Sequence, residues 1–246
     1  HSTSRRQRQM CIRDRNMSSR LVIALGIAGC VITAGCDLSA GRMIGFGACI
    51  SGMLLQRMDY SGKFFPDMQP LNVFVVALIA MLVCAAFGTV TGFFIAYLNV
   101  PPFIATLAMM EIVYGIGLIV TNATPLGGYV EQYTNVSNGK FLGINYLIWI
   151  AIIVAAITWF IFNMTRHGKY MYAIGGNPQA AEVAGVPVKA TLILIYMKAA
   201  AMYGLAGFML GAKAGGASVQ TGYGYEMEAI AACTIGGVSV TGGRGK

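Results

Sequence analysis

Apolar residues in this chain form long runs, separated by short segments in which polar residues, glycine and proline gather. Four runs hold about 20 residues or more, the length that a helix needs to cross the roughly 30 Å hydrocarbon core of a bilayer. The pattern predicts an all-α, polytopic helical membrane protein with about six to seven membrane segments. The apolar runs cover residues 21–36, 42–56, 71–98, 103–121, 145–163, 191–212 and 229–240.

The first two runs are shorter than a full crossing and are divided by a polar segment, residues 37–41. A single helix through both runs would be about 54 Å long at 1.5 Å per residue, which is too long for one crossing. We therefore expect two short or tilted crossings that join inside the membrane or near its surface.

Composition supports the membrane assignment. Hydrophobic residues make up 57% of the chain and charged residues 11%, against about 25% charged residues in a soluble domain. This excludes a soluble enzyme, a disordered tail and a fibrous repeat. Glycine is frequent, with 32 residues in 246, and several glycines recur at a spacing of four that allows close helix packing. These pairs are Gly41/Gly45, Gly88/Gly92 and Gly207/Gly211.

The net charge of +8 is concentrated at the start of the chain, where residues 1–20 hold six arginines and one aspartate. Aromatic residues that could stack on bases are absent from this run, so the charge does not indicate nucleic-acid binding. We interpret residues 1–20 as a non-native or disordered basic leader, with Met17 as a plausible start. Residues 21–246 then form the membrane domain.

Basic residues also predict the orientation of the chain. The loop 164–190 carries Arg166, Lys169 and Lys189, which places it in the cytoplasm. Counting membrane crossings in both directions then puts the segments 57–70, 122–144 and 213–228 outside, and the turn at residues 99–102 inside.

Candidates for enzyme chemistry are lacking in the sequence. The six cysteines form no CxxC pair and the two histidines offer no ligand spacing, so neither a metal nor a cofactor is expected. The end of the chain, Gly242-Gly243-Arg244-Gly245-Lys246, lacks the spacing of a phosphate-binding loop. Glu111 and Lys198 are lone charges inside apolar runs, which makes them candidates for ion coupling, although Lys198 could reach the surface along its own helix.

The polar break between the first two runs is the first candidate site, with Asp37, Ser39, Gly41 and Arg42 as residues of a substrate path. A carboxylate between apolar runs is costly unless it is paired or hydrated. Asp37 and Arg42 are close enough in sequence to pair across a turn, and Asp37 or Ser39 could cap a helix that starts near Ala40. Under one interpretation these residues cap the helix and form an ion pair, and under the other they line a permeation path. The two interpretations are compatible.

The second candidate is the long inside loop 168–188. Asn177 can cap a helix whose first residue is Pro178, and Gly185 can end it. A short alanine-rich helix at the membrane surface, after a glycine pair, has the form of a docking element for a partner. The alternative is a plain connector. The residues expected to couple are Gly175, Gly176, Asn177, Ala180, Ala181, Glu182 and Gly185.

Five segments in order resemble the permease subunit of bacterial ABC monosaccharide importers, the ribose/galactose family, and most closely its galactose/methyl-galactoside branch. They cover most of residues 21–246. The segments are Asp37–Arg42, Tyr97–Ile104, Ile112–Ile116, Ala173–Gly185 and Tyr225–Gly243.

The resemblance implies a multi-pass protein of the bacterial inner membrane that moves sugar by alternating access. It also implies cytoplasmic ATP-binding subunits that seat the loop 173–185, a periplasmic sugar-binding protein, and a second permease copy. Members of this family have a further N-terminal helix and continue with spanning helices after the position of Lys246, so we expect this chain to be a fragment. Two alternatives stay open: an ion-coupled secondary transporter with Glu111 and Asp37 as coupling carboxylates, and a scaffold without transport.

Overall fold

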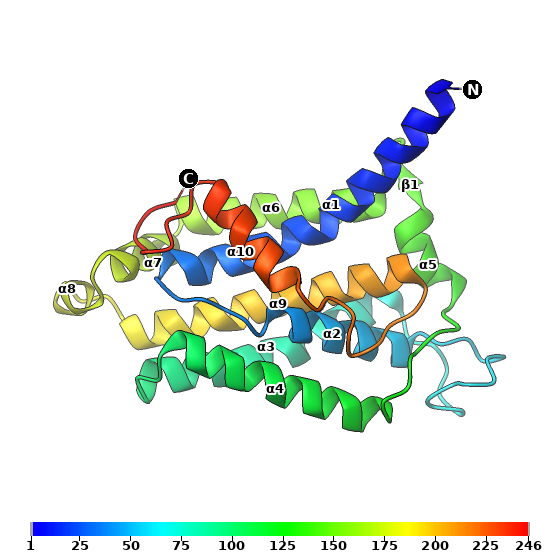
Figure 1. Ribbon diagram of the computed structural model, residues 1–246, viewed down its shortest axis with the longest axis horizontal. Coiled ribbons are helices and arrows are strands. Elements are labelled where there is room, and N and C mark those ends of the chain that lie inside the picture. The colour runs from blue at the N-terminus through cyan, green and yellow to red at the C-terminus, as the bar shows by residue number, and fades with distance from the viewer. Residues whose placement is uncertain (1, 246) are drawn as a thin grey trace.

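The chain is described by a computed structural model that covers residues 2–245, with side chains from Asn16 onward. It is a bundle of helices with one two-stranded hairpin (Figure 1). The elements are α1 (Ser2–Ile32), α2 (Ala40–Leu54), α3 (Val73–Tyr97), α4 (Pro102–Thr121), α5 (Glu131–Asn138), β1 (Lys140–Phe141), β2 (Ile144–Asn145), α6 (Tyr146–Met164), α7 (Arg166–Gly176), α8 (Pro178–Val183), α9 (Val188–Ala214) and α10 (Tyr225–Ile235).

Among the residues from Asn16 to Gly245, four helices are long and apolar enough to cross a membrane, namely α3, α4, α6 and α9, which confirms the four long runs of the sequence. Helix α9 is the centre of the bundle and packs against α1, α2, α3 and α5. In the most apolar 18-residue stretch of α9, 61% of the residues are buried, whereas 22% are buried in the corresponding stretches of α3, α4 and α6. The three outer helices therefore present most of their apolar surface outward, as lipid-facing helices do.

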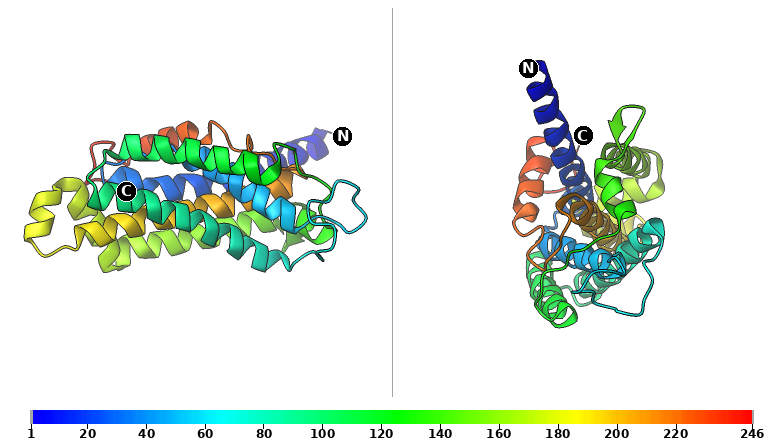
Figure 2. Two further views of the ribbon diagram at one scale, coloured as in Figure 1. Left: turned by 90° about the horizontal axis from the view of Figure 1, so that it is seen from below. Right: turned by 90° about the vertical axis from the view of Figure 1, so that its right-hand side faces the viewer.

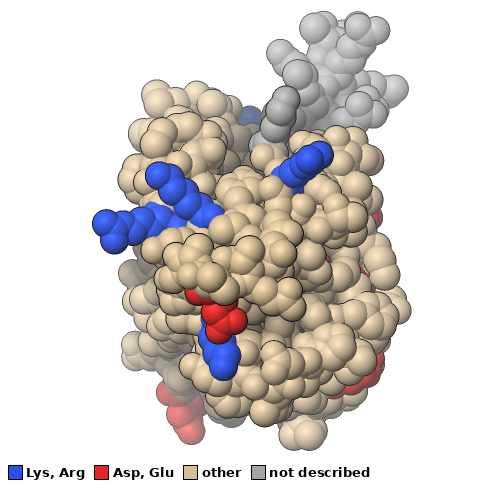
Figure 3. All heavy atoms as spheres, turned by 90° about the vertical axis from the view of Figure 1, so that its left-hand side faces the viewer, with Lys and Arg blue, Asp and Glu red and all other residues tan. Residues whose placement is uncertain are grey.

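The two ends of the bundle carry different elements (Figures 1 and 2). One end, the α5 end, holds α5 and the hairpin, where Arg57 N donates to Gly128 O at 2.8 Å. The opposite end, the α8 end, holds α7, α8 and the turn between α3 and α4. Lys and Arg side chains project from the α8 end (Figure 3), which agrees with the cytoplasmic side predicted from the basic residues.

Helices α2 and α10 are too short to cross. Their 15 and 11 residues correspond to about 22 Å and 16 Å, against a hydrocarbon core of roughly 30 Å. Helix α1 ends at the α8 end of the bundle, and residues 33–39 then return toward its middle, where α2 begins and runs to the α5 end. The predicted join is therefore present inside the bundle, between α1 and the short helix α2 (Figure 1).

The segment 213–228 differs from the expected outside loop. At the α5 end, Ala217 pairs with Leu126. The chain then passes along α2 toward the middle of the bundle, and a methyl group on Gly45 would lie 2.7 Å from Val219 O. Helix α10 starts there and runs to the α8 end. The prediction that this whole segment lies outside was wrong, because the glycines in the segment allow the chain to enter the bundle without a helix.

The three glycine pairs predicted to pack closely do so. A methyl group on Gly92 would lie 2.7 Å from Ile193 Cα, and one on Gly207 would lie 2.7 Å from Ala48 N. The close approach holds α3 and α2 against α9 without a hydrophobic force between helices. Gly115 on α4 is different, because a methyl group there would meet nothing within 4 Å.

Candidate functional site

We call α2 and α10, which are too short to cross the membrane, the half-helices. Their N-termini meet near the middle of the bundle. A methyl group on Gly41 would collide with the carboxylate of Glu226 and lie 2.9 Å from Gly222 O, so the contact requires glycine at position 41. Glu226 is buried, and its Oε2 accepts a hydrogen bond from Gly224 N at 3.1 Å. The positive ends of α2 and α10 both favour this carboxylate at membrane depth.

Arg42, on the first turn of α2, is held by neutral groups from distant segments. Its guanidinium carbon lies 4.0 Å from the ring centre of Tyr114 on α4 and 4.4 Å from that of Tyr223. Arg42 Nη1 donates to Gln220 Oε1 at 3.0 Å, and Gln220 Nε2 donates to Tyr114 Oη at 3.2 Å. Arg42 Nε is buried with no hydrogen-bond partner. We call Arg42, Tyr114, Gln220 and Tyr223 the central cluster.

Asp37 does not pair with Arg42, so the expected ion pair is wrong. Its Oδ1 accepts from Ser39 N at 3.0 Å and from Ser39 Oγ at 2.6 Å. Its Oδ2 accepts from the hydroxyl of Tyr203, near the middle of α9, at 3.1 Å. Salt bridges among the side chains from Asn16 onward join Arg20 to Glu228 and Arg57 to Asp59. Asp37 is buried and satisfied by hydroxyl and amide donors, which leaves Arg42 free to turn toward Tyr114.

The expected helix cap is also different. Ser39 is the residue before α2, but its side chain makes no capping hydrogen bond to the helix. Its hydroxyl donates to Asp37 instead, because the buried carboxylate needs donors more than the helix end needs an acceptor. Asp37 and Ser39 therefore fix the bend before α2, while Gly41 and Arg42 face the junction with α10.

The central cluster opens on the surface of the chain. The side chain of Tyr223 is 61% exposed, and Gln220 is exposed. Open space surrounds the positions of Gly115 and Gly224, where added methyl groups would meet nothing within 4 Å. Glu111, one turn before Gly115 on α4, is exposed as well. We call this surface, formed by α4 and residues 220–224, the open face.

The loop at the α8 end has the predicted local structure. Asn177 Oδ1 accepts from Ala180 N at 3.0 Å, and Pro178 is the first residue of α8. The helix ends at Val183, and Gly185 follows with a left-handed φ of +82°. The cap, the proline and the stop are therefore confirmed.

The expected coupling residues separate into two groups. Gly175 and Ala181 are buried, whereas the others lie on the surface of the loop. Val183, which the sequence did not single out, is 91% exposed at the end of α8. Nearby, burial lowers the pKa of His167 on α7, and the charge of Lys198 lowers it further. The surface residues of the loop are Gly176, Asn177, Ala180, Glu182 and Gly185.

The loop touches both segments that lead to the central cluster. A methyl group on Gly175 would collide with Ile32 O, the last residue of α1, and would lie 2.5 Å from Gly243 N. Gly243 N donates to Ile32 O at 2.8 Å. From Ile32 the chain leads to Arg42, and from Gly243 it leads back through α10 to Glu226. Gly175 on α7 is therefore in contact with the segments that lead to both half-helices.

The two lone charges of the apolar runs are placed differently. Lys198 does not reach the surface along its helix, because its Nζ is buried without a hydrogen-bond partner and lies 4.4 Å from the ring centre of Phe162. Glu111 lies on the open face. In the part of the chain from Asn16 to Gly245, acidic, cysteine and histidine side chains form no group that could hold a metal ion.

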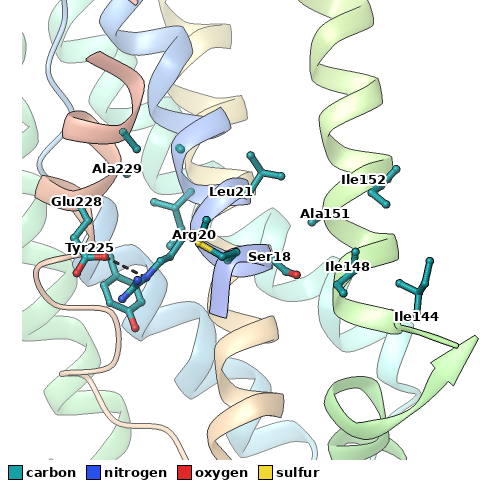
Figure 4. A pocket seen from close by; sticks show the side chains of 14 residues that line it. Ser18, Arg20, Leu21, Ile144, Ile148, Ala151, Ile152, Tyr225, Glu228 and Ala229 are labelled. Carbon is teal, nitrogen blue, oxygen red and sulfur yellow. Dashed lines mark ion pairs between the residues drawn. The ribbon is translucent and has the colours of Figure 1, made fainter. Parts of the chain in front are cut away.

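A cavity of about 740 Å³ lies elsewhere, between α1, α6 and α10 (Figure 4). Its walls are mostly apolar, and the ion pair of Arg20 and Glu228, 3.1 Å long, lies at its edge. None of the residues expected to form the substrate path or the coupling loop lines it. The cavity therefore adds no chemistry to the central cluster.

Sequence reasoning found Arg42 but missed its partners. Tyr114 falls in one of the five resembling segments, and Tyr223 lies between Gly222 and Gly224, a pattern that indicates a bend at an aromatic residue. Gln220 gave no signal. The pairing could not be foreseen because Arg42 and Gln220 are 178 residues apart in the sequence.

Comparison with known proteins finds a matching family and related permeases. A family described as "Branched-chain amino acid transport system / permease component" matches residues 16–243. The galactose/methyl galactoside import permease protein MglC of Escherichia coli (strain K12) is 43% identical over 235 residues, which are 93% of this chain and 70% of that protein. MglC of Haemophilus influenzae is also 43% identical over 235 residues, with the same shares of both chains.

A second group of relatives is more distant. The ribose import permease protein RbsC of Escherichia coli (strain K12) is 32% identical over 233 residues, which are 93% of this chain and 69% of that protein. No solved structure matches the chain.

Proposed function

Since this chain belongs to the branched-chain amino acid transport system / permease component family, a family of ABC-transporter permeases, we propose that it moves a monosaccharide across the inner membrane. The observation that carries the proposal is Arg42, held between two tyrosine rings where two half-helices meet at membrane depth. The identity to galactose and ribose import permeases along 93% of the chain supports a sugar of that size as the substrate.

A path for sugar at the open face requires a second protein surface. Charged and hydrogen-bonding side chains in the hydrocarbon region face a protein interior or a water-filled cavity, and non-helical backbone does the same. The open face presents Glu111, Gln220 and the non-helical residues 220–224. We infer that a second permease copy covers this face, and that sugar passes between the two copies.

The driving force comes from separate cytoplasmic ATP-binding subunits that bind the loop at the α8 end. Val183 and its exposed neighbours on α8 provide an apolar contact with a polar rim, which is the usual form of a protein interface. Closure of the ATP-binding subunits moves α7, and Gly175 passes the displacement to Ile32 and Gly243. A periplasmic sugar-binding protein delivers the substrate at the α5 end.

Reconstitution in liposomes with the ATP-binding subunits and the binding protein tests the proposal. We expect uptake of radiolabelled D-galactose or D-ribose that requires ATP and does not change when an ion gradient is imposed. Uptake driven by a proton or sodium gradient without the ATP-binding subunits would show an ion-coupled transporter instead. Absence of any sugar-dependent ATPase activity in the complete assembly would favour a scaffold.

Docking of the ATP-binding subunits is tested with Val183→Asp. A charge at the centre of an interface costs at least about 10-fold in binding, so we expect copurification of the ATP-binding subunits to fall by that factor. Leu142→Asp is the matched control, because Leu142 is 79% exposed in the hairpin at the α5 end. Equal copurification with both variants would mean that α8 is a plain connector.

A further inference from the structure

The guanidinium of Arg42 fills the space between two tyrosine rings that face it from different segments. Tyr114 belongs to the continuous helix α4 and lies 4.0 Å away, while Tyr223 lies in the non-helical chain before α10 and is 4.4 Å away. We infer that Tyr114 and Tyr223 form a stacking slot for the sugar ring, and that Arg42 occupies the slot until the sugar replaces it. The inference rests on the proposed function and names the residues that select the substrate.

Both occupants suit the same two rings. The face of an aromatic ring carries partial negative charge, which attracts the guanidinium cation and also the weakly positive C–H groups of a pyranose face. The exchange is therefore between two favourable contacts and does not leave the rings exposed.

Arg42 is prepared to bind the sugar that displaces it. Its Nε is buried with no hydrogen-bond partner, and its Nη1 donates only to the neutral amide of Gln220. A planar guanidinium presents its donors as a fork, which matches two neighbouring hydroxyl groups of a sugar. Because Arg42 keeps its positive charge beside the slot, an amino sugar such as D-galactosamine, which is a cation at pH 7, is repelled.

The two walls of the slot differ in mobility. Tyr114 is held within α4, and its hydroxyl accepts from Gln220 Nε2 at 3.2 Å. Tyr223 lies between Gly222 and Gly224, whose φ values are +88° and +89°, in a region that glycine adopts without strain. Open space around Gly224 gives the Tyr223 side chain room to move away. Tyr223 is therefore the wall that moves when Arg42 leaves the slot.

The test uses the complete importer in liposomes, with the permease, the ATP-binding subunits and the binding protein. Tyr223→Ala removes one wall, so we expect ATPase activity without sugar to rise and the KM for D-galactose uptake to rise, each by about 2- to 30-fold. Tyr223→Phe restores the ring and should recover most of both changes. D-Galactosamine should compete with D-galactose weakly in the wild type.

The matched control is Tyr225→Ala. Tyr225 contacts Arg20 at 5.4 Å, on the side of the chain that faces the cavity between α1, α6 and α10. The Tyr225→Ala substitution therefore removes an arginine–tyrosine contact outside the slot. Monodisperse elution of all variants confirms folding. The inference is wrong if Tyr223→Ala behaves as Tyr225→Ala does, or if Tyr223→Phe is as impaired as Tyr223→Ala. If the wild type itself takes up no sugar, it is the proposed function that fails.

Discussion

Arg42 and Arg20 each lie against tyrosine, but their surroundings differ in charge, in ring contacts and in burial. Arg20 forms a 3.1 Å ion pair with Glu228, and its guanidinium carbon is 5.4 Å from the ring centre of Tyr225. Arg42 lies closer to two rings and donates to an amide, and neither salt bridge found from Asn16 onward includes it. Arg42 is also buried, while the side chain of Arg20 is 47% exposed.

The difference separates a structural charge from one that can exchange partners. An arginine paired with a carboxylate loses an attraction between opposite charges as well as a hydrogen bond when it moves. Arg42 loses a hydrogen bond to a neutral amide and two ring contacts, which a sugar can replace. The neutral surroundings of Arg42 are therefore what makes it suitable for a transport site.

Removing each arginine gives the largest contrast. Arg42→Ala should lower D-galactose uptake by about 10- to 100-fold, because hydrogen bonds to a charged group contribute about 1.5–3 kcal/mol. Arg20→Ala should change uptake by less than about 3-fold, because Arg20 lies outside the central cluster and its exposed pair is weak. Initial rates in liposomes measure both. Similar losses for the two variants would remove the distinction between these residues.

Giving Arg42 the kind of partner that Arg20 has should produce a smaller effect. Gln220→Glu places a carboxylate at the atom that accepts from Arg42 Nη1 at 3.0 Å. The stronger bond should hold Arg42 in the slot and reduce uptake by about 5- to 10-fold. The control is Glu228→Gln, which removes the carboxylate from Arg20 and should leave uptake close to wild type. Faster uptake by Gln220→Glu would contradict the exchange of partners.

The ion pair at the cavity should give the smallest effect. Arg20 and Glu228 are about half exposed, at 47% and 52%, so a double-mutant cycle with Arg20→Ala and Glu228→Ala should show a coupling below about 1 kcal/mol. Thermal unfolding in detergent at low and high salt measures it, and high salt should weaken it further. A coupling free energy of several kcal/mol that does not change with salt concentration would show that protein covers this pair in the assembled transporter.

The sequence predicted those parts of the structure that depend on neighbouring residues. The Asn177 cap with Pro178 and the stop at Gly185 are local, since each involves residues within a few positions of one another. The short sequence separation of Asp37 and Arg42 also led to the prediction of an ion pair between them, and that prediction was wrong. Asp37 accepts instead from Tyr203, 166 residues away, because its burial against α9 brings a hydroxyl within reach.

The amino-acid sequence by itself determined the class of protein, the four long membrane helices and the end of the bundle where basic residues gather. Hydrophobic length and charge act residue by residue against the bilayer, so no distant contact is needed to set them. Only the tertiary structure decided that α2 and α10 are half-helices whose N-termini meet, and that Tyr114, Gln220 and Tyr223 surround Arg42. These contacts depend on how closely glycine lets segments approach across the bundle, as at Gly41, and that distance is set by the packing of the whole chain.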